Sequence, residues 1–352
     1  MLSRAPWPVL LVLVAACARP ATPLPPVPAP TPTAVPPVEL PRDAGAHDAL
    51  TEWWYYTGHL YAADRPSDYG FEFVVFQVRR EASPAIYFAH FAVTDIGLGS
   101  FSHQARFTRG AFQPGFNLEV QGWRLTGDGT TDLIEAAMEP GPGVSAPYAL
   151  ALRLADRKPP ALHHGGYIEY GDAGGSYYYS RTRLAVSGQL RDHAGAWVPV
   201  SGQAWMDHQW GNFVVSGSGG WDWYSLQLED DTELMLYVLR GPTGETAAVY
   251  GSQVEPDGTV HELAPGSIRA QALGHWPSPH TGATYPSGWL VELADPPLRL
   301  RVLPRLPDQE LYFPGAEAEG LAYWEGAVEV AGERTGAPIG GVGYVELTGY
   351  AR

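Results

Sequence analysis

Three short motifs place carboxylate or histidine side chains among tryptophans and tyrosines, as acid catalysis on an apolar substrate requires. The first, residues 51–59, contains Glu52 with Trp53, Trp54 and Tyr56. Strand alternation puts Glu52, Trp54 and Tyr56 on one face. Burial among aromatic rings raises the pKa of a carboxyl group, so Glu52 would hold a proton near neutral pH and serve as a general acid. The alternative is a rim glutamate beside core aromatics.

The second motif, residues 205–212, contains Trp205, Asp207, His208 and Trp210. Alternation separates Asp207 from His208, and only a bulge or turn would bring the two side chains together. His208 shares its face with Trp210, whose π-face would stabilise a cation beside a titratable group. The alternative is a hydrogen-bonded structural histidine on a barrel's closing strand.

The third motif, residues 220–225, places Asp222 between Trp221 and Trp223. Asp222 is either part of an acidic site or a hydrogen-bonding residue at a domain junction. His90 lies within an otherwise apolar strand and is either a core histidine or a ligand-facing residue. We take as candidate catalytic residues Asp207, His208, Trp210, Glu52 and Asp222. The candidate ligand-binding residues are Trp53, Trp54, Tyr56, His90, Trp205, Trp221, Trp223 and Tyr237.

The N-terminal segment looks like an export signal. Arg4 precedes an apolar run, residues 7–14, that is too short to span a bilayer. The run ends in Val14-Ala15-Ala16-Cys17, which resembles the lipobox of bacterial lipoproteins. An ordinary signal peptide with an incidental cysteine is the alternative. We expect Cys17, the only cysteine, to carry a lipid that anchors the protein in the cell envelope, at the outer membrane or the outer face of the cytoplasmic membrane.

Composition and the absence of certain motifs restrict the classes of partner and of enzyme that the sequence allows. Ten prolines between residues 20 and 41 predict an extended linker, which we place at residues 18–46 after a signal peptide at 1–17. A formal net charge of −16 argues against nucleic acid as a partner. No Gly-x-Ser-x-Gly elbow, His-Glu-x-x-His motif or phosphate loop is present. The pair His163-His164 reads as a loop and is a weak metal signal, so we predict neither a metal site nor a cofactor.

Alternating apolar and polar residues predict strands throughout, including 72–78, 85–93, 182–188, 233–239 and 298–302, and no helical periodicity extends over ten residues. An internal echo pairs Pro199 with Pro338, Gly202 with Gly341, Trp205 with Tyr344 and Asp207 with Glu346. Residues 53–56 similarly match residues 221–224. We therefore predict an all-β fold of two repeated antiparallel barrels, at 47–215 and 216–352.

Several stretches resemble the carotenoid 1,2-hydratase (hydroxyneurosporene synthase)/AttH-like family, whose nearest branch is often labelled "predicted secreted hydrolase". They are residues 51–58, 87–95, 176–180, 205–211, 220–223, 323–326 and 343–350. The resemblance implies two consecutive lipocalin-like (calycin) barrels. It also implies functions that range from cofactor-free hydration of a carotenoid's terminal double bond to cyclisation and lipid transfer.

Hydratase members use an Asp-His-x-Trp stretch, which Asp207, His208 and Trp210 match, together with a downstream Tyr and Asp. Only Tyr237 is a plausible counterpart of that downstream pair. We expect a monomeric exported lipoprotein that binds a carotenoid-, isoprenoid- or lipid-like ligand, and the sequence leaves open whether it also hydrates that ligand. A lipid-binding or transfer protein without catalysis, or a secreted hydrolase, remains the alternative.

Overall fold

The computed structural model describes residues 35–63, 68–80, 83–170, 174–213, 219–264, 266–313 and 321–351. Cys17 and most of the predicted linker lie outside these ranges. Residues 37–352 form one compact unit. Within the described ranges, no helix has both the length and the apolar character needed to cross a membrane.

The first sheet has the strand order β4-β3-β2-β1-β11-β10-β8-β7-β6-β5, and β9 pairs with β10. Its strands are β1 (Thr51–Ala62), β2 (Asp68–Val78), β3 (Ala85–Asp95), β4 (Ser100–Gly110), β5 (Asn117–Val120), β6 (Trp123–Gly127), β7 (Thr131–Ala137), β8 (Ala149–Asp156), β9 (Ala161–Glu169), β10 (Gly174–Arg191) and β11 (Trp197–Phe213). The two ends of this order, β4 and β5, approach each other, so the sheet curls into a barrel.

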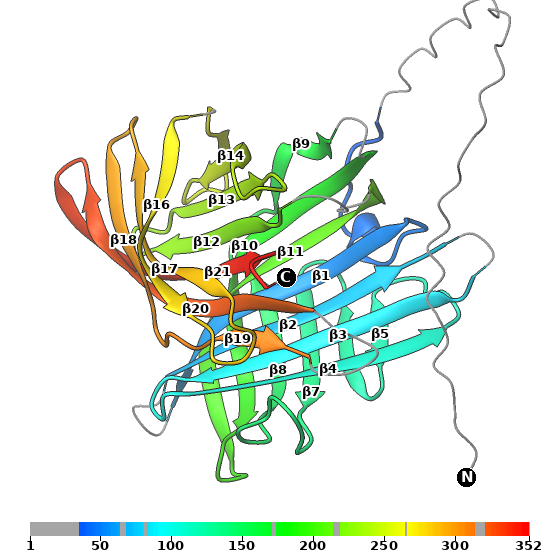
Figure 1. Cartoon of the computed structure of the whole chain (residues 1–352). Coiled ribbons are helices and arrows are strands. Elements are labelled where there is room, and N and C mark those ends of the chain that lie inside the picture. The colour runs from blue at the N-terminus through cyan, green and yellow to red at the C-terminus, as the bar shows by residue number, and fades with distance from the viewer. Residues whose placement is uncertain are drawn as a thin grey trace, which may run out of the picture. The chain divides into compact units, whose positions relative to one another are not determined.

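The second sheet has the order β15-β14-β13-β12-β21-β20-β18-β17-β16, and β19 pairs with β20. Its strands are β12 (Trp221–Leu228), β13 (Glu233–Arg240), β14 (Thr246–Val254), β15 (Val260–Glu262), β16 (Ile268–Pro277), β17 (Thr284–Leu293), β18 (Leu298–Pro304), β19 (Glu310–Tyr312), β20 (Ala322–Arg334) and β21 (Ala337–Thr348). Figure 1 shows the two sheets curling as separate bodies, with β16–β18 of the second at the left. The predicted all-β fold of two antiparallel barrels is confirmed.

The first and last strands of each sheet pair with each other. In the first, β1 pairs with the last strand, β11, and in the second β12 pairs with the last strand, β21. The registers also correspond: Asp207 of β11 lies opposite Tyr55, and Glu346 of β21 lies opposite Trp223. These are the positions that the internal echo in the sequence aligns.

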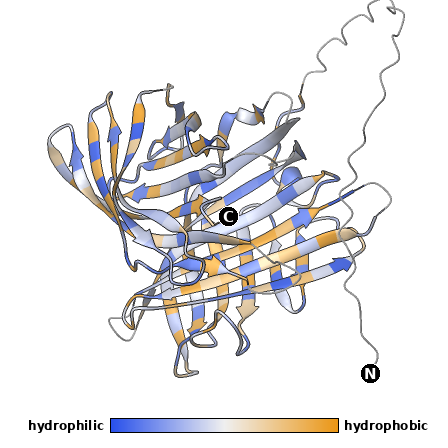
Figure 2. Ribbon diagram, viewed as in Figure 1, coloured by the Kyte–Doolittle hydropathy of each residue, from blue (hydrophilic) through white to orange (hydrophobic). Residues whose placement is uncertain are grey.

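Each barrel has its own apolar core. Trp54, Tyr56, Met206 and Trp210 belong to the first core, whereas Tyr224, Trp289 and Trp324 belong to the second. Figure 2 shows hydrophobic and hydrophilic residues alternating along the strands of the second sheet, as a strand with one buried face requires. This alternation leaves the opposite faces of β1, β11, β12 and β21 free to form the contact between the barrels.

The described end of the predicted linker packs on the first barrel. Residues Arg42–Ala44 form a short 3-10 turn, in which Asp43 and Ala44 are buried. Trp54 Nε1 donates a hydrogen bond to the carbonyl of Ala44 (3.0 Å), and Ala46 forms an isolated bridge with Gly115. The extended part of the predicted linker therefore ends before residue 46, and the last residues of the linker cover one end of the first barrel.

Polar side chains cross between the barrels. Lys158 of the segment after β8 contacts Glu233 at 2.8 Å, with both side chains buried. Gln227 Nε2 donates to the carbonyls of Thr182 (2.7 Å) and Ala204 (3.0 Å). Since a buried charge without its partner is strongly destabilising, these bonds specify how the two barrels dock.

Candidate active site

An aromatic pocket lies between the two barrels, and both contribute to its wall. It is a narrow cavity of about 80 Å³, lined by Trp53, Tyr55, Phe76, Tyr178, Asp207, Gln209, Trp221, Trp223, Tyr237 and Glu346. Trp53, Trp221 and Tyr237 are half-buried, so the pocket reaches the surface there. Its only acidic groups are Asp207 and Glu346, one from each barrel.

Asp207 is buried in the wall of the pocket. Its Oδ2 accepts a hydrogen bond from the Tyr178 hydroxyl (2.7 Å), and its Oδ1 accepts from Trp205 Nε1 (2.6 Å) and from the Ser180 hydroxyl. Burial raises the pKa of Asp207 to about 6, although these three donors act in the opposite direction. The carboxylate is therefore fixed in orientation by three donors.

Glu346 faces the pocket from the second barrel and is only half-buried. Trp221 Nε1 donates to its Oε2 (2.7 Å). Burial raises the pKa of Glu346 to about 7, the nearby Asp207 charge adds to this rise, and the bond from Trp221 opposes it. A carboxyl group with a pKa near the working pH has a large protonated fraction and readily transfers its proton, which makes Glu346 suited to general acid catalysis.

Two further buried glutamates lie behind Glu346. Glu325 is its register partner on β20 and accepts a hydrogen bond from the Tyr55 hydroxyl (2.6 Å). Within the described part of the chain, neither oxygen of Glu72 has a hydrogen-bond partner. Burial raises the pKa of both Glu72 and Glu325 well above the usual range. Burial therefore favours the protonated form of both side chains.

Rings from both barrels surround the carboxyl groups. Trp223 meets Tyr55 and Trp205 edge to face, with centroid separations of 5.3 and 6.0 Å. Trp223 Nε1 also donates to the Tyr178 hydroxyl (3.2 Å), which in turn donates to Asp207. This chain of hydrogen bonds orients aromatic faces beside the acidic groups, an arrangement suited to an apolar or cationic species.

The second motif divides between two sites, because β11 is a regular strand here. Asp207 faces the pocket, whereas His208 and Trp210 point into the first barrel together with Glu52. His208 Nε2 lies 2.8 Å from Glu52 Oε1, and Trp54 stacks on His208 at 4.8 Å. Glu52, His208 and Trp210 therefore cannot contact a ligand that lies beside Asp207. Tyr56 and Trp54 are fully buried in the same core.

Asp222 and His90 also lie outside the pocket. Asp222 pairs with Arg240 (3.1 Å) and accepts a hydrogen bond from Tyr350 (3.0 Å), as expected of a structural ion pair. His90 lies 2.7 Å from the Tyr323 hydroxyl, and burial lowers its pKa to about 3. Of the predicted ligand-binding residues, Trp53, Trp221, Trp223 and Tyr237 line the pocket, while Trp205 supports it through Asp207.

The site contains residues that the sequence reasoning did not select. Glu346, Tyr178, Gln209 and Phe76 line the pocket. In the sequence, the alignment of Glu346 with Asp207 in the internal echo was the signal that could have identified Glu346.

The expectation that His163-His164 forms a loop is wrong, since both residues belong to β9. His163 Nε2 there contacts the Ser180 hydroxyl (2.7 Å), so this buried histidine helps to hold a hydrogen-bond donor to Asp207.

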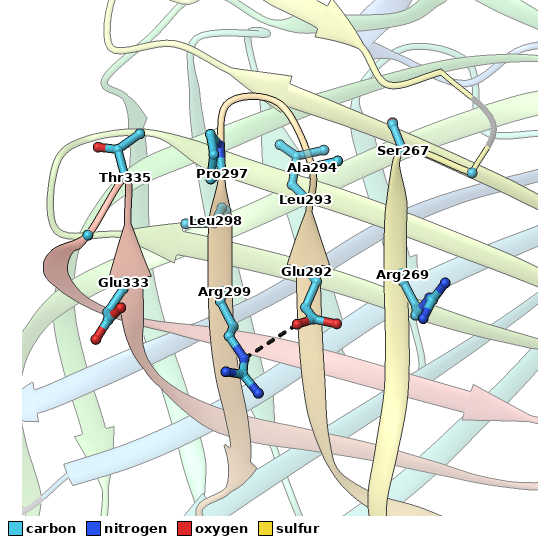
Figure 3. A pocket seen from close by; sticks show the side chains of 12 residues that line it. Ser267, Arg269, Glu292, Leu293, Ala294, Pro297, Leu298, Arg299, Glu333 and Thr335 are labelled. Carbon is cyan, nitrogen blue, oxygen red and sulfur yellow. Dashed lines mark ion pairs between the residues drawn. The ribbon is translucent and has the colours of Figure 1, made fainter.

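A different depression, of about 430 Å³, lies where strands end in the second barrel (Figure 3). Its charged residues are exposed or half-exposed, and the one ion pair drawn joins Arg299 and Glu292 at 3.4 Å. Exposed pairs of this kind contribute little free energy. The pocket between the barrels is therefore the candidate active site.

Comparison with known proteins supports a family assignment. A putative AttH from Nitrosomonas europaea is 29% identical, with a TM-score of 0.78, covering 91% of this chain and 99% of its own. Kievitone hydratase from Nectria haematococca has the same fold at 15% identity, with a TM-score of 0.68, covering 89% and 93% of the two chains. No curated protein sequence matches significantly. The AttH-like family model matches residues 31–350, and the chain therefore belongs to the AttH-like family.

Proposed function

We propose that this protein binds an apolar, isoprenoid-like ligand in the pocket between its barrels and adds water to a double bond of that ligand. The observation that carries the proposal is that Asp207 and Glu346, contributed by different barrels, are the two acidic groups of one aromatic pocket. The hydratase named among proteins of the same fold is in line with this chemistry.

The reaction needs three groups. Glu346 gives its proton to one alkene carbon, and a new C–H bond forms as the π-bond breaks. The resulting tertiary cation lies among Trp53, Trp223 and Tyr237, whose π-faces stabilise positive charge. The fixed carboxylate of Asp207 adds an opposite charge. A water oxygen then bonds to the cation, and its spare proton returns to Glu346, so the net change is the addition of one water.

The size of the pocket restricts how a ligand enters. A volume of about 80 Å³ is small beside the roughly 300–1,000 Å³ of ordinary ligand pockets. Only the end of a long ligand fits between the rings, with the remainder at the mouth formed by Trp53, Trp221 and Tyr237. A terminal double bond of an acyclic isoprenoid has this shape.

The proposal is tested by incubating the purified protein with an acyclic carotenoid that has terminal trisubstituted double bonds, in detergent and water enriched in ¹⁸O. We expect a product that has gained one labelled water, detected by mass spectrometry. Recovery of the carotenoid bound but unchanged would contradict hydration.

Binding without chemistry is the second candidate. Asp207 accepts hydrogen bonds from Tyr178, Ser180 and Trp205, and such a residue equally serves to hold the pocket in shape. Native mass spectrometry of protein extracted from its source membrane distinguishes the two, since a carrier retains an unmodified apolar molecule. Hydrolysis through a serine or cysteine nucleophile finds no support, because the pocket lining consists of aromatic, amide and carboxyl side chains.

The proposal also includes the location of the protein at a membrane. A lipid on Cys17 and the proline-rich stretch that follows would hold the barrels near a bilayer, where apolar ligands concentrate. Hydration as described needs no nucleotide cofactor, which suits an exported protein.

A further inference from the structure

A second group of titratable residues lies at one end of the first barrel, away from the pocket. Its members are His47, Glu52 and His208, and one nitrogen or oxygen of each lies within 4.8 Å of those of the other two. Glu52 Oε1 is 2.7 Å from His47 Nδ1 and 2.8 Å from His208 Nε2. We propose that these three atoms form a binding site for one zinc-like divalent cation.

The donor set is the first argument. Two imidazole nitrogens and one carboxylate oxygen are the three protein ligands of many four-coordinate zinc sites, in which water occupies the fourth position. Zinc bonds of about 2.0–2.1 Å place tetrahedral ligand atoms roughly 3.3 Å apart. The side chains of Glu52 and the two histidines would therefore separate by about half an ångström from their present hydrogen-bonded distances.

The groups around the three side chains are the second argument. Metal-bound histidines usually direct the remaining ring nitrogen to a carboxylate, carbonyl or other polar group. Here His47 Nε2 lies 3.6 Å from Asp43, and His208 Nδ1 lies 3.2 Å from the Tyr179 hydroxyl. Gln77 Nε2 holds the second oxygen of Glu52 at 3.0 Å. Each proposed ligand thus already has a partner that orients it.

The burial of Glu52 and His208 and the partial exposure of His47 also fit a metal site. Glu52 and His208 are fully buried, so the fold places them before an ion arrives, whereas the side chain of His47 is 22% exposed and leaves a route of entry. The ring of His47 stacks on Trp210 with centroids 4.1 Å apart, which fixes its position. An ion bound here would connect His47, which precedes β1, with Glu52 on β1 and His208 on β11. It would thereby hold the end of the linker against the barrel.

This site is separate from the proposed function. His208 and Asp207 leave β11 on opposite faces, and none of the three proposed ligands lines the pocket between the barrels. Loss of the ion is therefore not expected to remove the acidic groups that the hydration proposal uses.

The test uses the full chain without a polyhistidine tag, dialysed against metal-free buffer and then against excess ZnCl₂ followed by metal-free buffer. We expect about one equivalent of zinc to remain by elemental analysis, and zinc to raise Tm. Cobalt(II) should give the visible absorption of a tetrahedral site. His47→Ala and Glu52→Gln should each lower zinc affinity at least about tenfold.

His280→Ala is the matched control, because His280 lies 2.8 Å from Asp308 but, among the described residues, is not in the group of three potential metal ligands. Its zinc content should equal that of the wild type. His47 is the primary target because its side chain is partly exposed, so we expect His47→Ala to fold. Circular dichroism of the variant checks that it is folded. No retained zinc in the wild type, or equal retention in His47→Ala and Glu52→Gln, would overturn the proposal.

Discussion

Asp207 and Glu346 occupy equivalent positions on the closing strands of the two barrels and face one pocket. Asp207 lies opposite Tyr55 in the pairing of β11 with β1, and Glu346 lies opposite Trp223 in the pairing of β21 with β12. Their surroundings differ, however: three side-chain donors hold Asp207, whereas Glu346 accepts a hydrogen bond from Trp221. The two barrels thus supply two carboxyl groups with different surroundings to one pocket.

Replacing Glu346 by Gln removes the proton donor and retains the shape of the side chain. We expect turnover in the hydration assay to fall about 10²–10⁴-fold, the usual contribution of a general acid. Ligand binding, followed by quenching of tryptophan fluorescence, should change little. Glu329→Gln, at an exposed position of β20, is the control and should retain full activity. Full activity in Glu346→Gln would exclude this acid.

Asp207→Asn should abolish turnover with the fold intact. The amide carries no charge to stabilise a cation, and its NH₂ group cannot accept one of the bonds from Tyr178, Ser180 and Trp205. The free energy of unfolding should fall by about 1–3 kcal/mol, as for other buried groups left without a partner. The hydration assay measures the loss of turnover, and urea unfolding followed by circular dichroism measures the change in the free energy of unfolding. Unchanged turnover would show that Asp207 is structural only.

The stability of the protein should depend on the protonation of Glu346. Because its pKa is raised from 4.5 to about 7 on folding, the folded state binds this proton more tightly than the unfolded chain does. The contribution is complete below pH 4.5 and is lost as the pH rises through 7. Glu346→Gln lacks this loss, so it should gain stability relative to wild type between pH 5 and 8, by less than about 1.4 kcal/mol per pH unit.

Urea unfolding of both proteins at several pH values measures this difference. Groups that do not interact with Glu346 affect both proteins alike and cancel in the comparison, whereas Asp207, whose charge raises the pKa of Glu346, contributes to the difference. A difference that does not change between pH 5 and 8 would be inconsistent with a raised pKa at Glu346.

Trp221→Phe should shift the pH dependence of activity. Trp221 donates to Glu346 Oε2 at 2.7 Å and thereby favours the charged carboxylate. Without that bond the pKa of Glu346 rises further, so the alkaline limb of the rate profile should move up by roughly 1 pH unit. Trp197→Phe, at a residue that is 49% exposed, should leave the profile in place. A lower rate with an unmoved limb would indicate a packing effect alone.

Cys17→Ser tests the proposed anchor. Without the thiol no lipid can be attached, and the protein should move from the membrane fraction to the soluble fraction of the cell envelope. Detergent phase partition and the mass of the mature N-terminus report the change. Membrane association that survives the substitution would mean that another part of the chain attaches it.

The sequence by itself determined the class of fold. Alternation along segments such as 72–78 and 85–93 predicted strands, because residues with a period of two bury one face of a sheet. The internal echo predicted the repeat, since the turns and closing strands of each barrel impose the same residue types. It also separated Asp207 from His208, because adjacent residues of a regular strand lie on opposite faces.

Only the tertiary structure decided which residues meet. The pocket needs β1, β2, β10, β11, β12, β13 and β21 together. Docking of one barrel on the other depends on contacts between residues far apart in the chain, such as Lys158 and Glu233. For the same reason only the folded structure places Glu346 in the pocket, and only the folded structure places His47 beside Glu52 and His208. Periodicity determines which face a side chain occupies, whereas the surroundings of that face depend on long-range packing.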